Sequence, residues 1–321
     1  MKIAIPDDYI SIIKTLDCFK ILNGQDVLVL NHFEPNSHLL AEKIHDAEIL
    51  VLTRERTTIN DELLSRLPKL KLISQTGKIS NHLDLSACTR HHVAVSEGVG
   101  SPVAPAELAW LLIMNTTRQI PAAIEGMKNG KWQVNMGSTI HGKTIGIWGY
   151  GKIGKRMAQY AKAFGAQVMV WGSDASRKNA VQDGFESANS REAFFKTADI
   201  VSLHLRLNQT TFEIVKESDL NLMKPSSVFI NTARAELVEK GALLNCLKNG
   251  RPGFAGIDVY EEEPVYNPDY PLLKMSNVVC TPHLGYAEKN SYELYFGKAF
   301  ENVMNFINGN PTNIANPEVL I

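Results

Sequence analysis

The stretch TIGIWGYGKIG occupies residues 144–154 and joins a short apolar run to three regularly spaced glycines. The apolar run has the composition of a buried strand, and residues 155–164 have helical spacing. A strand, a Gly-x-Gly-x-x-Gly turn and a helix in this order predict a dinucleotide-binding unit. The diphosphate is expected against the glycine backbone at the positive end of the helix. The loop consists of Gly149, Tyr150, Gly151, Lys152, Ile153 and Gly154.

The chain around this loop alternates between apolar runs and helical patterns. Further strands are expected at residues 167–171, 199–205, 227–232, 254–259 and 277–281, and helices at 106–117, 191–197 and 239–249. Such alternation predicts a parallel sheet covered by helices on both faces. We therefore expect a dinucleotide-binding domain over residues 102–286.

The first hundred residues alternate in the same way and predict a second doubly wound sheet. Strands are expected at residues 2–5, 25–30, 48–53, 70–75 and 93–95, and helices at 37–45 and 61–67. A further helical stretch, residues 288–308, is expected to return to this first domain because the other sheet is complete without it. The predicted fold class is α/β with two doubly wound parallel-sheet domains, and residues 1–101 and 287–321 form the substrate domain.

Composition narrows the class of function. The chain has 321 residues, 44% of them hydrophobic, and a net charge of −1, which suits about two globular domains. It therefore lacks the charge excess expected for binding nucleic acid or an anionic membrane. Its four cysteines have no metal-ligand spacing, and no apolar run approaches the roughly 20 residues needed to span a bilayer. We expect a cytoplasmic protein that acts on a small molecule, without a metal site.

Three ionisable residues follow predicted strands, where ligands of open α/β sheets bind. Arg234 follows residues 227–232, Glu263 follows residues 254–259, and His283 follows residues 277–281. Histidine can take a hydroxyl proton while hydride leaves the same carbon, and a neighbouring glutamate can hold the imidazole in one tautomer. Arginine matches a carboxylate with two N–H groups. The set suits reduction of a 2-oxo acid.

The residues after the 167–171 strand bear on the choice of cofactor. Asp174 lies 20 residues beyond Gly154, the offset expected for an acid that holds the adenosine ribose. Gly172 nevertheless comes directly after the strand, and Arg177 and Lys178 follow soon after. NAD is favoured, and NADP remains open because nearby cations can admit a 2′-phosphate.

A second phosphate-binding pattern is a chance match. Residues 137–144, GSTIHGKT, fit the Walker A spacing. A Walker A loop must follow a strand and open a helix, whereas this segment precedes a predicted strand. We therefore reject nucleotide triphosphate binding there.

The sequence resembles the D-isomer-specific 2-hydroxyacid dehydrogenases, a family that includes phosphoglycerate, glycerate and D-lactate dehydrogenases. The resemblance rests on four stretches in the family's order, residues 142–154, 223–234, 255–264 and 281–285. It implies a flavodoxin-like substrate domain and a Rossmann domain with a cleft between them. It also implies a homodimer formed through the cofactor domain.

The resemblance assigns roles to individual residues. It makes Arg234 the substrate-binding arginine, Glu263 the partner of the histidine, and His283 the acid/base. The loop Thr76, Gly77 and Lys78 resembles the segment that binds the substrate carboxylate through its backbone. Cofactor contacts are implied for the glycine loop and for Ser173, Asp174, His204, Leu205, Thr232, Ala233, Asp258 and Gly285.

Some positions depart from the family pattern and leave alternatives open. Gly172 replaces the usual acid, and Arg206 stands where proline is common. Lys78 adds a cation that is either a solvated loop residue or a contact to a second anionic group of the substrate. A regulatory protein that senses nicotinamide is the alternative to an enzyme, although it would not need the Arg234, Glu263 and His283 set. Formate dehydrogenase would require glutamine at Glu263.

Overall fold

The structure is a computed structural model that describes residues 1–320. The chain divides into two compact units. Unit 1 comprises Met1–Ser101 and the segment that starts at Glu288, and unit 2 comprises Pro102–Ala287. At the end of unit 2, the Ala287 N–H donates to Leu284 O (2.9 Å).

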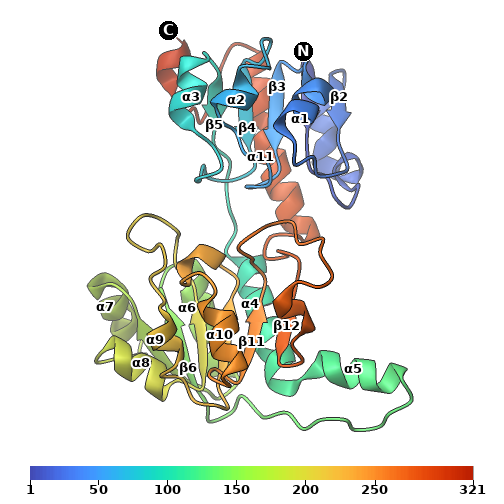
Figure 1. Ribbon diagram of the computed structural model, residues 1–321. Helices are drawn as coiled ribbons and strands as arrows, with labels where there is room; N and C mark the ends of the chain where they lie inside the picture. The colour runs from blue at the N-terminus through green and yellow to red at the C-terminus, as the bar shows by residue number, and fades with distance from the viewer. Residues whose placement is uncertain (321) are drawn as a thin grey trace. The chain divides into compact units, whose positions relative to one another are not determined.

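Unit 1 contains a five-stranded parallel sheet in the order β2-β1-β3-β4-β5 (Figure 1). This is the flavodoxin-like order, as expected. The strands are runs of three or four residues, buried in β3, β4 and β5 and partly exposed in the edge strand β2: β1 Lys2–Ile5, β2 Asp26–Val29, β3 Ile49–Leu52, β4 Leu72–Gln75 and β5 Ala94–Ser96. The helix α11 (Lys289–Ile307) packs on this sheet, and Ser74 Oγ donates to Ala299 O (2.8 Å).

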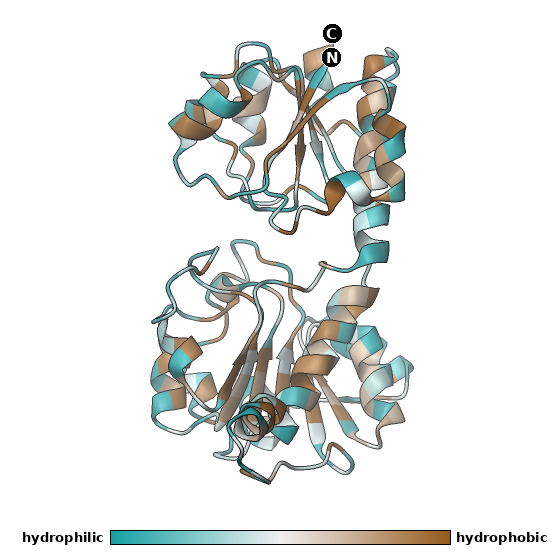
Figure 2. Cartoon of the chain, turned by 90° about the vertical axis from the view of Figure 1, so that its right-hand side faces the viewer, coloured by the Kyte–Doolittle hydropathy of each residue, from teal (hydrophilic) through white to brown (hydrophobic). Residues whose placement is uncertain are grey.

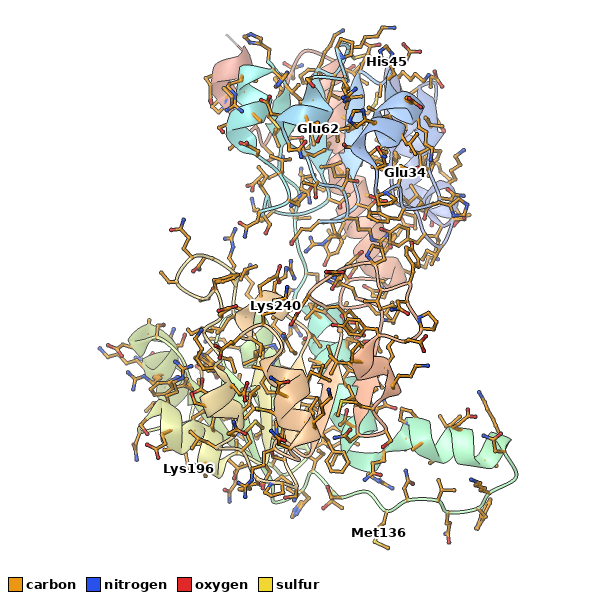
Figure 3. The ribbon with its side chains drawn as sticks, in the orientation of Figure 1. Glu34, His45, Glu62, Met136, Lys196 and Lys240 are labelled. Atoms are coloured by element: carbon orange, nitrogen blue, oxygen red, sulfur yellow. The ribbon has the colours of Figure 1, made fainter. Side chains whose placement is uncertain are left out.

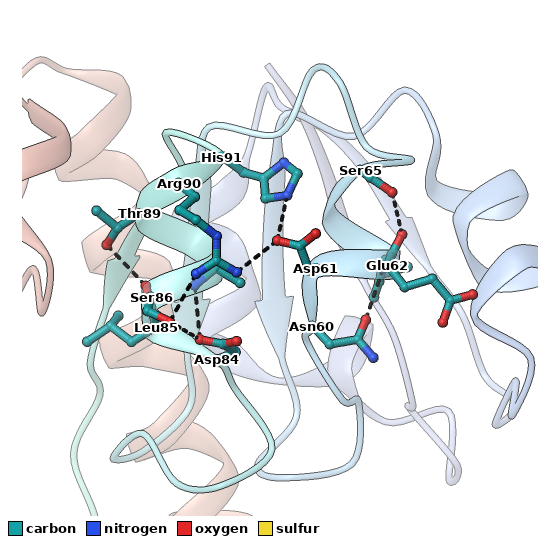
Figure 4. Close-up of polar contacts among 12 residues, drawn as sticks. Asn60, Asp61, Glu62, Ser65, Asp84, Leu85, Ser86, Thr89, Arg90 and His91 are labelled. Atoms are coloured by element: carbon teal, nitrogen blue, oxygen red, sulfur yellow. Dashed lines mark hydrogen bonds and ion pairs between the residues drawn. The ribbon is translucent and has the colours of Figure 1, made fainter.

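The short helices of unit 1 begin at side chains that cap them. They are α1 Ser37–Ile44, α2 Asp61–Leu64 and α3 Leu85–Arg90. Asn60 accepts the Leu63 N–H at the start of α2, and Asp84 accepts the Ala87 N–H at the start of α3. These bonds satisfy N–H groups that have no partner within the helix. Arg90 pairs with Asp61 at 2.9 Å and joins the two helices (Figure 4).

Unit 2 contains a seven-stranded parallel sheet in the order β12-β11-β10-β9-β6-β7-β8. Read from β8, the order of its first six strands is 3-2-1-4-5-6, the Rossmann topology. The switch point lies between the adjacent strands β6 and β9. The strands are β6 Thr144–Trp148, β7 Gln167–Trp171, β8 Glu186–Ser187, β9 Ile200–Leu203, β10 Val228–Asn231, β11 Phe254–Ile257 and β12 Val278–Cys280.

Helices flank this sheet, whose two faces are covered by separate apolar clusters. Fully buried Phe194 and Phe229 belong to one cluster, and Met157 and Ile230 to the other. The strands are accordingly coloured as hydrophobic in Figure 2. The helices are α4 Val103–Arg118, α5 Ile120–Lys128, α6 Lys152–Ala163, α7 Asp174–Gln182, α8 Arg191–Thr197, α9 Glu217–Leu220 and α10 Ala242–Lys248.

Several helix boundaries differ from expectation. Helix α2 ends at Leu64 rather than at residue 67, and helix α4 begins at Val103 rather than at residue 106. Helix α6 begins at Lys152, inside the glycine motif, rather than at residue 155. Helix α10 begins at Ala242 rather than at residue 239, because Gly241 has a φ of +73° and Glu239 accepts the Glu217 N–H. The rejected Walker-like segment lies in the loop that precedes β6, as expected.

None of the helices within residues 1–320 has the length and apolarity needed to cross a membrane. In the same residues, no group of three or more His, Cys, Asp or Glu side chains is arranged to hold a metal ion.

Candidate active site

The glycine loop connects β6 to α6 in a geometry that only glycine permits at two positions. Gly149 has a φ of +101°, and a Cβ there would lie 2.6 Å from His204 O. A Cβ on Gly154 would lie 2.0 Å from Gly149 O. Gly151, the residue before α6, has open space where its Cβ would be. The start of α6 is therefore not crowded by a side chain at Gly151. A dinucleotide diphosphate can approach the N–H groups of the first turn there.

Tyr150 fastens this loop to the end of α7. Its side chain is buried, and its hydroxyl donates to Asp183 Oδ2 at 3.0 Å. Lys155 Nζ donates to the same oxygen at 2.8 Å. Burial, together with the Asp183 carboxylate, raises the pKa of the Tyr150 hydroxyl, so it remains a donor at physiological pH. The second residue of the motif thus helps to hold the loop in position.

The end of β7 lies beside the glycine loop, and Gly172 occupies its tip. Gly149 N donates to Trp171 O (2.9 Å), and a Cβ on Gly172 would lie 3.7 Å from Gly149 N. Ser173 caps α7 by accepting the Ser176 N–H, and Asp174 is the first residue of that helix. Asp174 pairs with Arg177 of the same helix.

His204 and Leu205 border the glycine loop on its other side, after β9. His204 N donates to Trp148 O (2.8 Å), and the imidazole Nε2 lies 2.9 Å from Ser202 Oγ. Burial lowers the pKa of His204 to about 4, so the ring is neutral at physiological pH. The loop is therefore flanked by β7 and β9, the two neighbours of β6 in the sheet.

The buried carboxylate of Asp258 organises the residues around His283. Its Oδ1 accepts the Thr281 hydroxyl (2.6 Å) and the Leu284 N–H (2.7 Å), and its Oδ2 accepts the Gly285 N–H (2.9 Å). Burial raises the pKa of Asp258, and these hydrogen bonds oppose the rise. Asp258 thus holds the backbone on both sides of His283, which has a φ of +51°.

His283 and Glu263 form the hydrogen-bonded pair that the sequence predicts. Nδ1 of the imidazole lies 2.6 Å from Glu263 Oε2. The other carboxylate oxygen accepts the Tyr260 N–H (2.9 Å), and the Tyr260 hydroxyl donates to Thr281 O (2.9 Å). A carboxylate beside Nδ1 places the proton on that nitrogen and leaves Nε2 to exchange protons. The Tyr286 ring stands edge-on to the imidazole, with centroids 5.7 Å apart.

Arg234 follows β10, the neighbour of β11 in the sheet, and lies in a turn organised by Asn231. The buried Asn231 side chain accepts the Ala233 N–H (3.0 Å) and donates to Arg234 O (2.8 Å). The turn also contains Thr232, and it places Arg234 at the same edge of the sheet as the ends of β11 and β12. Sequence reasoning assigned no role to Asn231 or Tyr260, although both lie within stretches that carry the family resemblance.

The predicted substrate loop of unit 1 follows β4. Within residues 1–320, the N–H groups of Gly77 and Lys78 have no hydrogen-bond acceptor. Lys78 Nζ pairs with Glu97 Oε2 at 2.6 Å, and the other Glu97 oxygen accepts the Ile79 N–H (3.0 Å). Lys78 therefore fastens the loop, in which Gly77 is buried and Lys78 is exposed.

Arg54 covers this loop, a contact that sequence reasoning missed. Its Nη1 donates to Thr76 O (3.1 Å), and its backbone N–H donates to Thr76 Oγ1 (2.8 Å). A Cβ on Gly77 would lie 2.0 Å from Arg54 Nη1, so the glycine makes room for the guanidinium. A single arginine after a strand carries no sequence signal that distinguishes it from a surface cation.

The fold and the site define an oxidoreductase with a nucleotide-binding Rossmann domain, and comparisons with known proteins identify its family. The family model for the NAD-binding domain of D-isomer-specific 2-hydroxyacid dehydrogenases matches residues 110–285. A glyoxylate reductase of Thermococcus litoralis is 33% identical over 89% of this chain and 88% of its own length. A D-3-phosphoglycerate dehydrogenase of Methanocaldococcus jannaschii is 34% identical over 77% of this chain and 47% of its own length.

A solved structure agrees with these relatives. The phosphoglycerate oxidoreductase of Vibrio cholerae o395 is 51% identical and superposes with a TM-score of 0.94, covering 96% of this chain and 99% of that one. The chain belongs to the D-isomer-specific 2-hydroxyacid dehydrogenase family.

Two glycines of the loop make a matched pair of variants. Gly154→Ala is expected to destabilise unit 2, because its Cβ would clash with Gly149 O. Gly151→Ala is expected to fold normally, since the position has a φ of −84° and open space, yet to weaken cofactor binding by about tenfold or more because it fills the approach to the diphosphate. Thermal unfolding and calorimetric titration with the cofactor check both. Equal affinity for Gly151→Ala and the parent would contradict the assigned approach.

Proposed function

We propose that the protein transfers hydride between a nicotinamide cofactor and a small D-2-hydroxy acid/2-oxo acid pair, with His283 as the acid/base. The observation that carries this proposal is the 2.6 Å contact between His283 Nδ1 and Glu263 Oε2, within a turn held by buried Asp258. Relatives named glyoxylate reductase cover nearly the whole chain, which makes glyoxylate the first 2-oxo acid to test.

The proton path follows from the tautomer of His283. The bound cofactor supplies or accepts the hydride. In the reducing direction, hydride adds to the carbonyl carbon while His283 Nε2 donates a proton to the carbonyl oxygen, and Glu263 stabilises the positive charge of the imidazolium before that transfer. In the oxidising direction, Nε2 takes the hydroxyl proton.

Recognition of the acid group is assigned to Arg234 and to the loop after β4. The Arg234 guanidinium offers two parallel N–H groups to a carboxylate and polarises the neighbouring carbonyl. The N–H groups of Gly77 and Lys78, which have no acceptor within residues 1–320, suit a second set of hydrogen bonds to an anionic group. We infer no direct substrate contact for the Lys78 ammonium, because Glu97 already pairs with it.

Removal of the imidazole tests the central assignment. His283→Ala is expected to lower kcat for glyoxylate reduction by roughly 10²- to 10⁴-fold, because the proton donor is lost. Cofactor affinity, measured by nicotinamide fluorescence, is expected to stay unchanged, since His283 contacts Glu263 rather than the glycine loop. Turnover close to that of the parent would refute the acid/base role. Tight cofactor binding by the parent protein without turnover of any 2-oxo acid would favour the regulatory alternative.

Substitution of the arginine tests recognition of the carboxylate. Arg234→Lys keeps the charge but cannot reproduce two parallel hydrogen bonds, so kcat/KM for the 2-oxo acid is expected to fall by at least about tenfold. The matched control is Arg251→Lys, which changes an exposed arginine of the same unit. Steady-state kinetics with both variants give the comparison. A kcat/KM for Arg234→Lys equal to that of the control would contradict the role of Arg234 in binding the substrate carboxylate.

We further propose that the protein forms a homodimer through unit 2. An arm comprising residues 119–138 extends from α4 and consists of α5 and the segment that returns along it (Figure 1). Val134 packs on Gly126, and Ser138 N donates to Thr117 O (3.0 Å) at the base of the arm. Met127, Trp132 and Met136 are exposed by 67%, 75% and 91%, and Figure 3 labels Met136 on this arm. Apolar side chains gathered on an exposed projection are typical of an interface between subunits.

A charge on the arm tests the dimer. Met127→Asp is expected to weaken self-association by at least about tenfold, because association would bury an unpaired carboxylate. Leu39→Asp, at an exposed apolar position of α1 in unit 1, is the matched control and is expected to leave self-association unchanged. Sedimentation velocity over a concentration series measures the effect. A monomeric parent protein, or equal behaviour of the two variants, would overturn the assignment.

A further inference from the structure

We propose that the adenosine end of the cofactor site is built for a 2′-phosphate, so that the protein prefers NADP(H) to NAD(H). This inference rests on the proposed nicotinamide-dependent function and concerns the residues on either side of the glycine loop. Three observations support it: the backbone at position 172, the charges after β7, and the cation after β9.

The backbone at the tip of β7 excludes a side chain. Gly172 has a φ of +148°, a conformation that residues with a Cβ rarely adopt. A carboxylate that holds both ribose hydroxyls normally stands at the end of this strand and repels a 2′-phosphate. Here the strand tip presents only backbone and the hydroxyl of Ser173, which bears no charge. The position is therefore open to a dianion.

Two cationic residues, Arg177 and Lys178, follow this position in the first turns of α7. The Arg177 guanidinium lies over the Trp171 ring, with Cζ 4.9 Å from its centroid, and its buried Nε has no hydrogen-bond partner in residues 1–320. Stacking on the ring restricts the guanidinium before any ligand binds. Lys178 is exposed, one residue further along α7, and forms no ion pair in the described chain.

Arg206 adds a positive charge from the opposite side of the glycine loop. It lies two residues after His204, whose carbonyl oxygen borders Gly149. Its side chain is exposed and makes no ion pair or hydrogen bond within residues 1–320. The Gly149 backbone thus separates two loops that each contribute cations, one after β7 and one after β9.

The acid in this region does not reverse the balance. Asp174 lies on α7 rather than at the strand tip, its side chain is 80% exposed, and Arg177 pairs with it. That pair is neutral overall. Lys178 and Arg206 remain without acidic partners in the described structure, so the field at the ribose end is positive and favours a phosphate.

Binding, measured without substrate, tests the proposal on the full-length protein. Isothermal titration calorimetry with NADPH and NADH is expected to give an affinity for NADPH at least about tenfold higher, as a charge-assisted phosphate site requires. The ratio is expected to shrink at high salt, because screening weakens exposed charge interactions. An affinity for NADH equal to or higher than that for NADPH overturns the preference and leaves the proposed function standing. Failure to bind either cofactor overturns both.

Two pairs of variants locate the effect. Ser173→Asp retains a good helix cap but adds a carboxylate beside Gly172, and Ser173→Asn retains the cap without the charge. We expect the Asp variant to lose at least about tenfold more NADPH affinity than the Asn variant, with no such difference for NADH. Arg206→Ala is expected to weaken NADPH selectively, whereas Lys248→Ala, which removes a distant exposed cation, serves as its charge-matched control. Equal losses for NADPH and NADH in Ser173→Asp and Arg206→Ala would contradict the assignment.

Discussion

The hydrogen bonds of one buried carboxylate hold together the part of the molecule in which we place the chemistry. Asp258 directly follows β11 and accepts three donors from the turn that carries His283. Because a buried carboxylate is costly unless its oxygens are bonded, the turn cannot leave this arrangement without exposing an unpaired charge. The same constraint maintains the left-handed backbone of His283. The position of the proposed acid/base is therefore fixed by a carboxylate that is itself buried.

The glycine loop after β6 is a second backbone constraint in the same sheet. Gly154 packs so closely on Gly149 that neither tolerates a side chain, and His204 and Trp171 contact Gly149 through their backbones. The residues that follow or end three adjacent strands, β7, β6 and β9, are thus in contact at Gly149. Parallel strands bring their carboxyl ends to one edge, so the loop shares this edge with Arg234 and His283.

The sequence predicted the two sheets well, because buried parallel strands are short apolar runs and the glycine spacing is specific. It also predicted the pairing of Glu263 with His283. It did not reveal why Asp258 matters, since its partners are mostly backbone N–H groups that any residue could supply. Nor did it reveal the Arg54 contact with Gly77, or the exposure of the apolar side chains on the arm of residues 119–138. Both depend on which segments meet in three dimensions. The Lys78–Glu97 pair likewise joins segments that follow different strands.

The proposed cofactor choice and the proposed chemistry are separable in this architecture because they depend on loops that follow different strands. The charge that we propose for the adenosine ribose site comes from residues after β7 and β9, whereas the proposed acid/base and carboxylate-binding residues follow β10, β11 and β12. The two sets belong to different loops, and no ion pair or hydrogen bond within residues 1–320 joins Arg177 or Arg206 to His283. Because the Asp258 hydrogen bonds hold the His283 turn independently of β7, a change at the tip of β7 can alter the charge presented to the ribose without moving the imidazole. In this proposal the Gly172 backbone bears on which cofactor binds, while the Asp258 carboxylate fixes the position of the proposed acid/base.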